Sequence, residues 1–143
     1  IVGLCFFGDK SYFVRQEERT YDLERLVPFL QEKGIALFDT ATRIIRTTGT
    51  ASDKDLQIVE ETNLSAMLSQ LPDCQAVVTA GQLATTVACR QFAADEPKVG
   101  ESSRLVTGDG RRLLLFRMPS TSRAYPLSLE KKAAQYQKVF SLL

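Results

Sequence analysis

The chain has 143 residues, of which 44% are hydrophobic and 24% charged, and its formal net charge is +1. This composition is typical of a globular protein with its own core, and no apolar run approaches the roughly 20 residues that span a bilayer. The absence of histidine excludes Ser-His-Asp triads, Cys-His pairs and histidine-containing zinc sites.

Three cysteines without a C-x-x-C spacing indicate a reduced, cytoplasmic protein. They are also too few for the usual four-thiolate iron–sulfur cluster. Any chemistry would therefore depend on carboxylates, hydroxyls, amides and water, and we expect neither a metal nor another cofactor.

Charge is unevenly distributed along the chain. Residues 1–103 contain 10 lysines and arginines against 15 aspartates and glutamates, a net charge of −5. Residues 104–143 contain 8 against 2, a net charge of +6. This asymmetry favours a polyanionic partner, unless the two parts interleave in the fold and the asymmetry disappears in space.

The first part of the chain predicts a helix followed by a short strand. Ile1–Phe7 is apolar from its first residue, so we expect a further segment upstream of it. Apolar residues recur at helical spacing over residues 22–33, with Asp22 as the N-terminal cap and Gly34 at the end. Residues 35–40 then predict a short buried strand. This succession is typical of a layered α/β fold.

The rest of the chain predicts alternating helices and strands. Helices are expected over residues 64–71 after Asn63, over 82–92, and over 129–142 after Ser128. Strands are expected over residues 74–79, 103–107 and 111–117, the last two forming a hairpin around Gly108-Asp-Gly110. Because residues 74–79 do not alternate between apolar and polar, both faces of that strand should be buried. Together with residues 35–40, these segments predict one α/β domain with about four core strands.

Three segments, in this order and spacing, resemble the uracil-DNA glycosylase superfamily. Gly34-Ile-Ala-Leu-Phe-Asp-Thr40 is similar to the strand that reaches the base pocket, and Val77-Val-Thr-Ala-Gly-Gln-Leu-Ala84 to the central strand-to-helix turn. Met118-Pro-Ser-Thr-Ser-Arg-Ala-Tyr125 is similar to the minor-groove loop, in the histidine-free form associated with hypoxanthine or uracil removal. The family's first motif, which supplies a water-activating residue, should precede Ile1 or has been lost.

The resemblance implies one domain over residues 1–143, a three-layer α/β/α fold around a central, mostly parallel sheet of about four strands. It also implies a monomeric DNA repair enzyme, a monofunctional glycosylase, that acts on double-stranded DNA and not at a membrane. Such an enzyme flips a deaminated base, uracil or hypoxanthine, out of the stack and hydrolyses its N-glycosidic bond with water.

Asp39 is the candidate catalytic residue. Its carboxylate would accept a hydrogen bond from uracil N3–H or hypoxanthine N1–H, or would orient the attacking water. Its alternative role is to cap the loop that follows residues 35–40. Phe38, Thr79 and Gly81 are expected to line the base pocket beside it, and residues 47–53 to border the pocket mouth.

The candidate DNA contacts lie mainly in the loop after residue 117. Ser120 and its neighbouring hydroxyls would approach phosphates, while Arg123 or Tyr125 would enter the minor groove as a wedge. The expected DNA-contacting residues are Gln82, Pro119, Ser120, Thr121, Ser122, Arg123, Ala124, Tyr125 and Lys131. The alternatives are an ordinary strand-to-helix turn, and for Gly81 a packing role.

Two other functions remain open. The first is a DNA-binding relative without catalytic activity, which keeps the loop but not the chemistry. The second is an α/β domain that binds a nucleotide or nucleoside and does not contact duplex DNA. Salt-dependent binding to duplex DNA distinguishes the first from the second.

Overall fold

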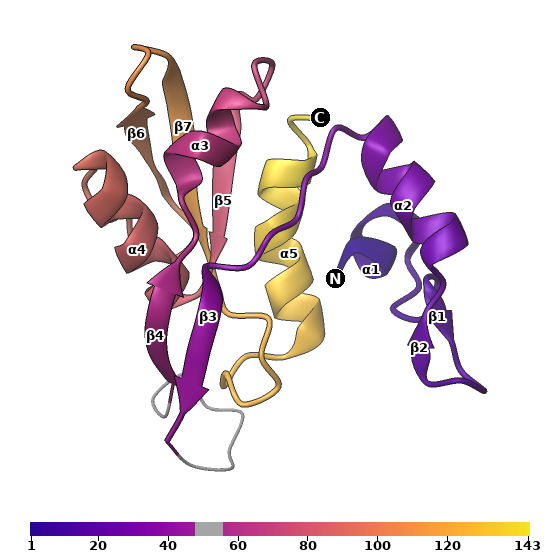
Figure 1. Ribbon diagram of the computed structural model, residues 1–143. Coiled ribbons are helices and arrows are strands. Elements are labelled where there is room, and N and C mark those ends of the chain that lie inside the picture. Colours follow the sequence, from indigo (N-terminus) through magenta and orange to yellow (C-terminus); the bar gives the residue numbers. More distant parts are fainter. Residues whose placement is uncertain (48–55) are drawn as a thin grey trace. The chain divides into compact units, whose positions relative to one another are not determined.

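The computed structural model describes residues 1–47 and 56–143, and the chain divides into two compact units (Figure 1). Unit 1 comprises Ile1–Phe38 and Pro126–Leu143, and unit 2 comprises Asp39–Tyr125. The described residues form a mixed α/β structure with five helices and three small sheets. Most of the expected pocket mouth, residues 47–53, lies outside the described residues.

The elements are assigned to the two units as follows. Unit 1 contains α1 (Val2–Phe7), β1 (Val14–Arg15), β2 (Thr20–Tyr21), α2 (Leu23–Glu32) and α5 (Leu129–Phe140). Unit 2 contains β3 (Ala41–Arg46), β4 (Leu56–Glu61), α3 (Leu64–Ser69), β5 (Ala76–Ala80), α4 (Gln82–Phe92), β6 (Ser102–Val106) and β7 (Arg112–Met118).

Unit 1 is held together by an aromatic cluster between its helices. The ring of Phe6 lies 5.0 Å from the ring of Phe29 and 5.1 Å from that of Phe140. Phe7 stacks on Tyr12 with 3.7 Å between the ring centroids. These contacts join α1, α2 and α5 and give the apolar residues at the start of the chain a packing role.

The helix predicted over residues 22–33 is confirmed as α2, but its start differs from the expectation. Asp22 precedes the helix without a side-chain cap, because its carboxylate accepts a hydrogen bond from Arg15 at 3.2 Å. Gly34 follows the helix with φ 66°, the left-handed conformation expected after a helix end.

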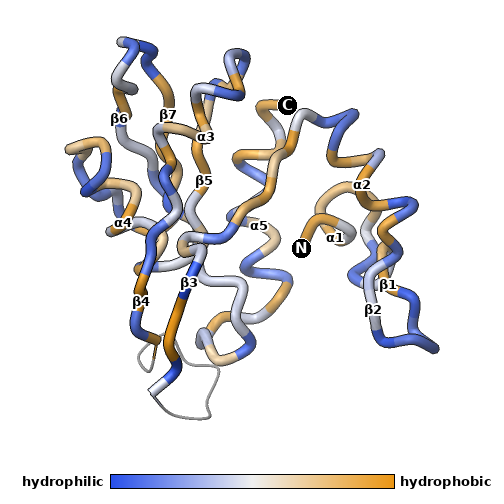
Figure 2. The backbone as a smooth tube through the Cα atoms, viewed as in Figure 1, coloured by the Kyte–Doolittle hydropathy of each residue, from blue (hydrophilic) through white to orange (hydrophobic). Residues whose placement is uncertain are grey.

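The buried strand predicted over residues 35–40 is wrong. Residues 35–39 have no regular secondary structure, and Leu37 and Phe38 are each 68% exposed. An apolar run becomes a buried strand only where another strand pairs with it, and no strand among residues 1–47 and 56–143 pairs with this run. The chain instead enters β3, which pairs with β4 as a separate antiparallel ribbon that the sequence did not predict. A hydrophobic stretch in β3 lies between hydrophilic ends (Figure 2).

The main sheet of unit 2 has three strands in the order β5-β7-β6 (Figure 1). β5 runs parallel to β7, and β6 runs antiparallel to β7. The predicted hairpin is therefore confirmed, and its second arm is the central strand. The described residues do not form a mostly parallel sheet of four strands. The hairpin requires one antiparallel pair, and residues 35–40 add no strand.

Helices α3 and α4 pack with one face of this sheet. The buried core there consists of Leu68, Ala88, Cys89, Leu105, Leu113 and Leu115. On β5, Val77 packs against this core, whereas its neighbour Val78 is 40% exposed. The prediction that both faces of this strand are buried is therefore wrong for Val78, which lies on the face opposite the two helices.

Candidate functional site

The carboxyl ends of the parallel strands β5 and β7 bring two of the predicted motifs together. Gly81 follows β5, and its N–H donates a 3.0 Å hydrogen bond to the carbonyl of Met118 at the end of β7. A Cβ atom added to Gly81 would lie only 3.2 Å from the Cβ of Ser120. Residues 77–84 and 118–125 thus meet at the sheet edge where α/β proteins commonly bind ligands. We call this edge the candidate site.

Gly81 is required by the backbone of the turn. Its φ of 96° and ψ of 175° lie in a region that is essentially restricted to glycine. Two buried hydroxyls support the turn from below. Thr85 Oγ1 donates to the Gly81 carbonyl at 2.8 Å and lies 2.8 Å from the Thr79 hydroxyl.

Thr79, an expected base-pocket residue, is buried beneath the turn. It is 5% exposed, and its hydroxyl donates to the carbonyl of Phe116 at 3.1 Å. The hydroxyl therefore links β5 to β7 and shapes the candidate site from within the core.

Gln82, an expected DNA contact, has its side-chain amide engaged within unit 2. Its Nε2 donates to Thr86 Oγ1 at 2.9 Å and to Glu96 Oε2 at 3.0 Å. Its Oε1 accepts a hydrogen bond from Arg117. The side chain would have to give up these bonds to hold a phosphate, so the N–H groups of the first turn of α4 are the better donors.

Glu96 and Arg117 complete a polar network that the sequence did not reveal. Hydrogen bonds from Thr86 and Gln82 hold the pKa of the Glu96 carboxyl below its usual value, with the charge of Arg117 acting in the same direction. Arg117 also donates to the Pro97 carbonyl at 3.2 Å, and its Nε is buried without a hydrogen-bond partner among the described residues. The network ties the base of the loop after β7 to the start of α4.

The loop after β7 is fixed by its own hydroxyls. Ser120 Oγ accepts the N–H of Ser122 at 3.2 Å, and Ser122 Oγ accepts the N–H of Ala124 at 3.2 Å. Pro119 is fully buried, while Tyr125 is half-buried and donates its N–H to the Ser122 carbonyl at 3.2 Å. A serine hydroxyl that accepts a backbone N–H keeps a proton that it can donate to a ligand oxygen.

Exposure distinguishes the remaining residues of the loop. Thr121, Arg123 and Ala124 are exposed. Of the two expected wedge residues, Arg123 is therefore exposed and Tyr125 half-buried.

Asp39 lies outside the setting that motivated its prediction. It is exposed, it precedes β3 and does not end a parallel strand, and its carbonyl accepts a 2.6 Å hydrogen bond from Thr62 Oγ1. Phe38 is the last residue of the first segment of unit 1, and Lys131 lies in the first turn of α5 in that unit. Within unit 2, the structure brings Gly81, Gln82 and the loop together.

Comparisons with protein-family models, curated proteins and solved structures found no match to this chain. In the described part of the chain, no helix has both the length and the hydropathy to cross a membrane. No group of three or more histidine, cysteine, aspartate or glutamate side chains among residues 1–47 and 56–143 is arranged to hold a metal ion.

Proposed function

We propose that the protein is a DNA repair glycosylase that removes uracil or hypoxanthine from double-stranded DNA. The observation that carries the proposal is the approach of Gly81 to Ser120 at the carboxyl ends of β5 and β7. The edge of the sheet at these strand ends carries a hydroxyl-rich loop and the start of a helix. Both features suit contacts to phosphates.

In this proposal, the loop grips the DNA backbone and the edge of the sheet receives the flipped base. Ser120, Thr121 and the first-turn N–H groups of α4 bind phosphates. Arg123 enters the minor groove, because it is exposed whereas Tyr125 is half-buried. Buried Pro119 stiffens the base of the loop, so little entropy is lost when DNA binds.

The chemical step in this proposal uses water and no cofactor. Water attacks the sugar carbon as the bond to the base breaks, the base leaves as an anion held by hydrogen bonds, and the proton that the water loses passes to solvent. The Asp39 carboxylate accepts the N–H that distinguishes a deaminated base from adenine or cytosine, or orients the water. The proposal includes a single monomeric cytoplasmic domain with three α/β/α layers.

The decisive experiment incubates the protein with duplexes that contain uracil or hypoxanthine and detects abasic sites by alkaline cleavage. Release of either base supports the proposal, and release of neither contradicts the enzymatic activity. Asp39→Ala should abolish release and keep most duplex binding, whereas Asp73→Ala, at another exposed aspartate, should leave both unchanged. Wild-type release by Asp39→Ala would remove Asp39 from the mechanism.

The loop requires a separate binding test. Ser120→Ala combined with Ser122→Ala should weaken duplex binding at low salt by about tenfold or more, since tenfold is the effect of losing one hydrogen bond to a charged phosphate group. The matched variant replaces the exposed Ser65 and Ser102 by alanine and should bind like the wild type. Equal affinity of the two double variants for the duplex would mean that the loop is an ordinary strand-to-helix turn without a role in DNA binding.

A DNA-binding protein without catalytic activity is the second candidate. The exposed position of Asp39 before β3 favours it, because that carboxylate lacks the strand-end setting expected of a catalytic group. Duplex binding that falls steeply with salt, without base release from either duplex, would select this second candidate.

A further inference from the structure

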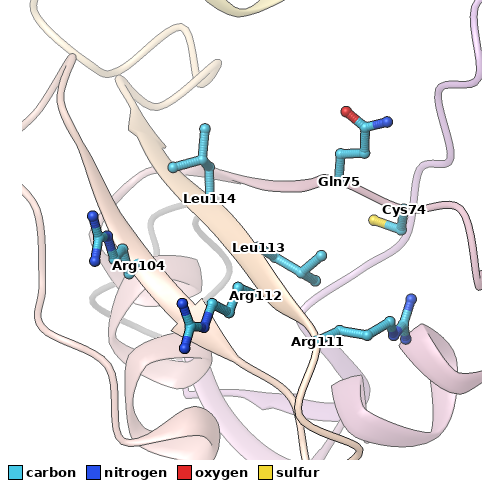
Figure 3. Close-up of a pocket in the computed structure, with 7 residues that line it drawn as sticks. All are labelled: Cys74, Gln75, Arg104, Arg111, Arg112, Leu113 and Leu114. Carbon is cyan, nitrogen blue, oxygen red and sulfur yellow. The ribbon is translucent and has the colours of Figure 1, made fainter.

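An arginine-lined pocket lies at the opposite ends of β5 and β7, away from the candidate site. Its volume is about 610 Å³, within the usual range of small-ligand pockets. Its lining includes Arg104, Arg111 and Arg112 together with Gln75 and Leu114 (Figure 3). Gln75 immediately precedes β5 and Arg112 begins β7, so the pocket opens at the amino ends of the two parallel strands.

Arg104 and Arg112 share one face of the sheet. Arg104 pairs with Leu114 and Val106 pairs with Arg112, so the two arginines are diagonal neighbours across β6 and β7. Such neighbours are about 7–8 Å apart at the backbone, within reach of a common ligand for long side chains. Figure 3 shows both side chains on the same side of β7.

Neither side chain has an acidic partner among the residues that the structure describes. Both residues are exposed, and no carboxylate of residues 1–47 and 56–143 forms an ion pair with either guanidinium. Two like charges held on neighbouring strands repel each other. An anion bound between the two guanidinium groups would attract both and offset their repulsion.

Arg111 has a different role in the same pocket. It points toward α3 (Figure 3) and donates to the carbonyls of Leu68 at 2.6 Å, Leu71 at 2.9 Å and Pro72 at 3.0 Å. It also pairs with Asp109 at 3.1 Å. Arg111 therefore fixes one wall of the pocket, and the guanidinium groups left for a ligand are those of Arg104 and Arg112.

We propose that this pocket binds a phosphate group between Arg104 and Arg112. Guanidinium groups donate paired hydrogen bonds to phosphate oxygens, and two of them can bind one tetrahedral anion from two sides. Leu114 is 42% exposed and Val106 53% exposed, and they offer apolar surface to the organic part of the ligand. The phosphate belongs either to a phosphorylated small molecule or to a nucleic-acid strand. This site is independent of the proposed glycosylase activity, because it lies at the other edge of the sheet.

The test titrates the protein with inorganic pyrophosphate and follows backbone amides by NMR. The amides of Arg104 and residues 112–114 should shift. Arg104→Gln with Arg112→Gln should weaken binding by about tenfold for each guanidinium removed. The matched variant, Lys98→Gln with Lys138→Gln, removes the same charge at two other exposed residues and should bind pyrophosphate like the wild type.

Two further ligands distinguish the sources of the phosphate. Adenosine monophosphate that shifts the same amides, with no effect of a short thymidine oligonucleotide, identifies a small molecule. An oligonucleotide that shifts them more strongly than the mononucleotide identifies a strand. The proposal is overturned if pyrophosphate shifts none of these amides, if the control variant weakens binding equally, or if a polyglutamate peptide binds there more tightly than pyrophosphate.

Discussion

Gly81→Ala tests whether the close approach of the two motifs stabilises unit 2. Gly81 has φ 96° and ψ 175°, a region that costs other residues about 1–3 kcal/mol. The added methyl group would also lie 3.2 Å from the Cβ and 3.5 Å from the Cα of Ser120, so the loop backbone must move. Overpacking of this kind adds about 1 kcal/mol or more. We therefore expect a loss of about 2–4 kcal/mol in the free energy of unfolding.

Two other glycines separate backbone strain from crowding. Gly110 has φ 84° but no atom of the described residues within 4 Å of an added Cβ, so Gly110→Ala should cost only the conformational strain, about 1–2 kcal/mol. Gly108 has no positive φ, and the described part of the chain places no atom within 4 Å of an added Cβ, so Gly108→Ala should be neutral or stabilise unit 2 by up to about 1 kcal/mol. The expected order of destabilisation is Gly81, then Gly110, then Gly108.

The assay combines urea unfolding, followed by circular dichroism, with hydrogen exchange of the β5 amides. Exchange reports unit 2 even if unit 1 unfolds separately. Ser120→Gly removes the atom that the new methyl group meets, and in a double-mutant cycle it should recover about 1 kcal/mol. A Gly81→Ala variant as stable as Gly108→Ala, or a cycle that is additive within about 0.5 kcal/mol, would refute the reasoning.

Three further predictions concern single side chains. Arg111→Met removes the hydrogen bonds to the carbonyls after α3 and should cost about 2–4 kcal/mol in urea unfolding. Arg112→Met, at an exposed arginine, should change stability by no more than about 0.5 kcal/mol. Equal losses of stability in the two variants would contradict the stabilising role of Arg111. The lowered pKa of Glu96 means that its stabilising effect is present above the usual pKa of a glutamate and is lost as the pH falls below that value. Glu96→Gln should make the stability of unit 2 less dependent on pH in that range, whereas Asp73→Asn should keep the pH dependence of the wild type. If the pH dependence is unchanged in Glu96→Gln, Glu96 does not stabilise unit 2 in this way. Burial raises the pKa of Tyr136 from 10.0 to about 12, so unit 1 should lose stability as the pH rises between these values. Tyr136→Phe should remove that loss in circular dichroism, and a loss that persists would assign it to another group.

Helices could be predicted because their signals are local and agree with one another. Asn63 precedes α3 and accepts the N–H of Ala66 at 3.0 Å. Ser128 precedes α5 and accepts the N–H of Lys131 at 3.3 Å. Each cap and the apolar spacing after it lie within a few residues of the chain, so no knowledge of distant contacts was needed.

The strands were harder to predict, because a strand exists only with a partner. The run at residues 35–38 looked like a buried strand, but no described strand pairs with it, and Leu37 and Phe38 are exposed. Conversely, β3 and β4 stabilise each other through cross-strand pairs such as Ile44 with Ile58, which neither segment reveals alone. The hairpin of β6 and β7 was predictable because its glycine-rich turn joins neighbouring segments.

The candidate site was predictable at the level of segments but not of side chains. Parallel strands bring their carboxyl ends together, and Gly81 and Ser120 do meet there. Glu96 and Arg117 were missed because their contacts with Gln82 span 14 and 35 residues of the chain. Neither residue lies in one of the three motifs. Only the folded chain shows that both bind the side chain of Gln82, which the sequence analysis had expected to contact DNA.

The mixed sheet has a consequence for the order of folding. β6 and β7 pair across a short turn, so their hairpin can form early. In the sequence, α4 and β6 lie between β5 and β7. The hydrogen bond from Thr79 in β5 to Phe116 in β7 therefore joins residues that are 37 positions apart. Closing that long loop lowers the chain entropy before the contacts between β5 and β7 can offset the loss. We therefore expect β5 to dock last, so that the edge where Gly81 meets Ser120 is completed only in the final step of folding.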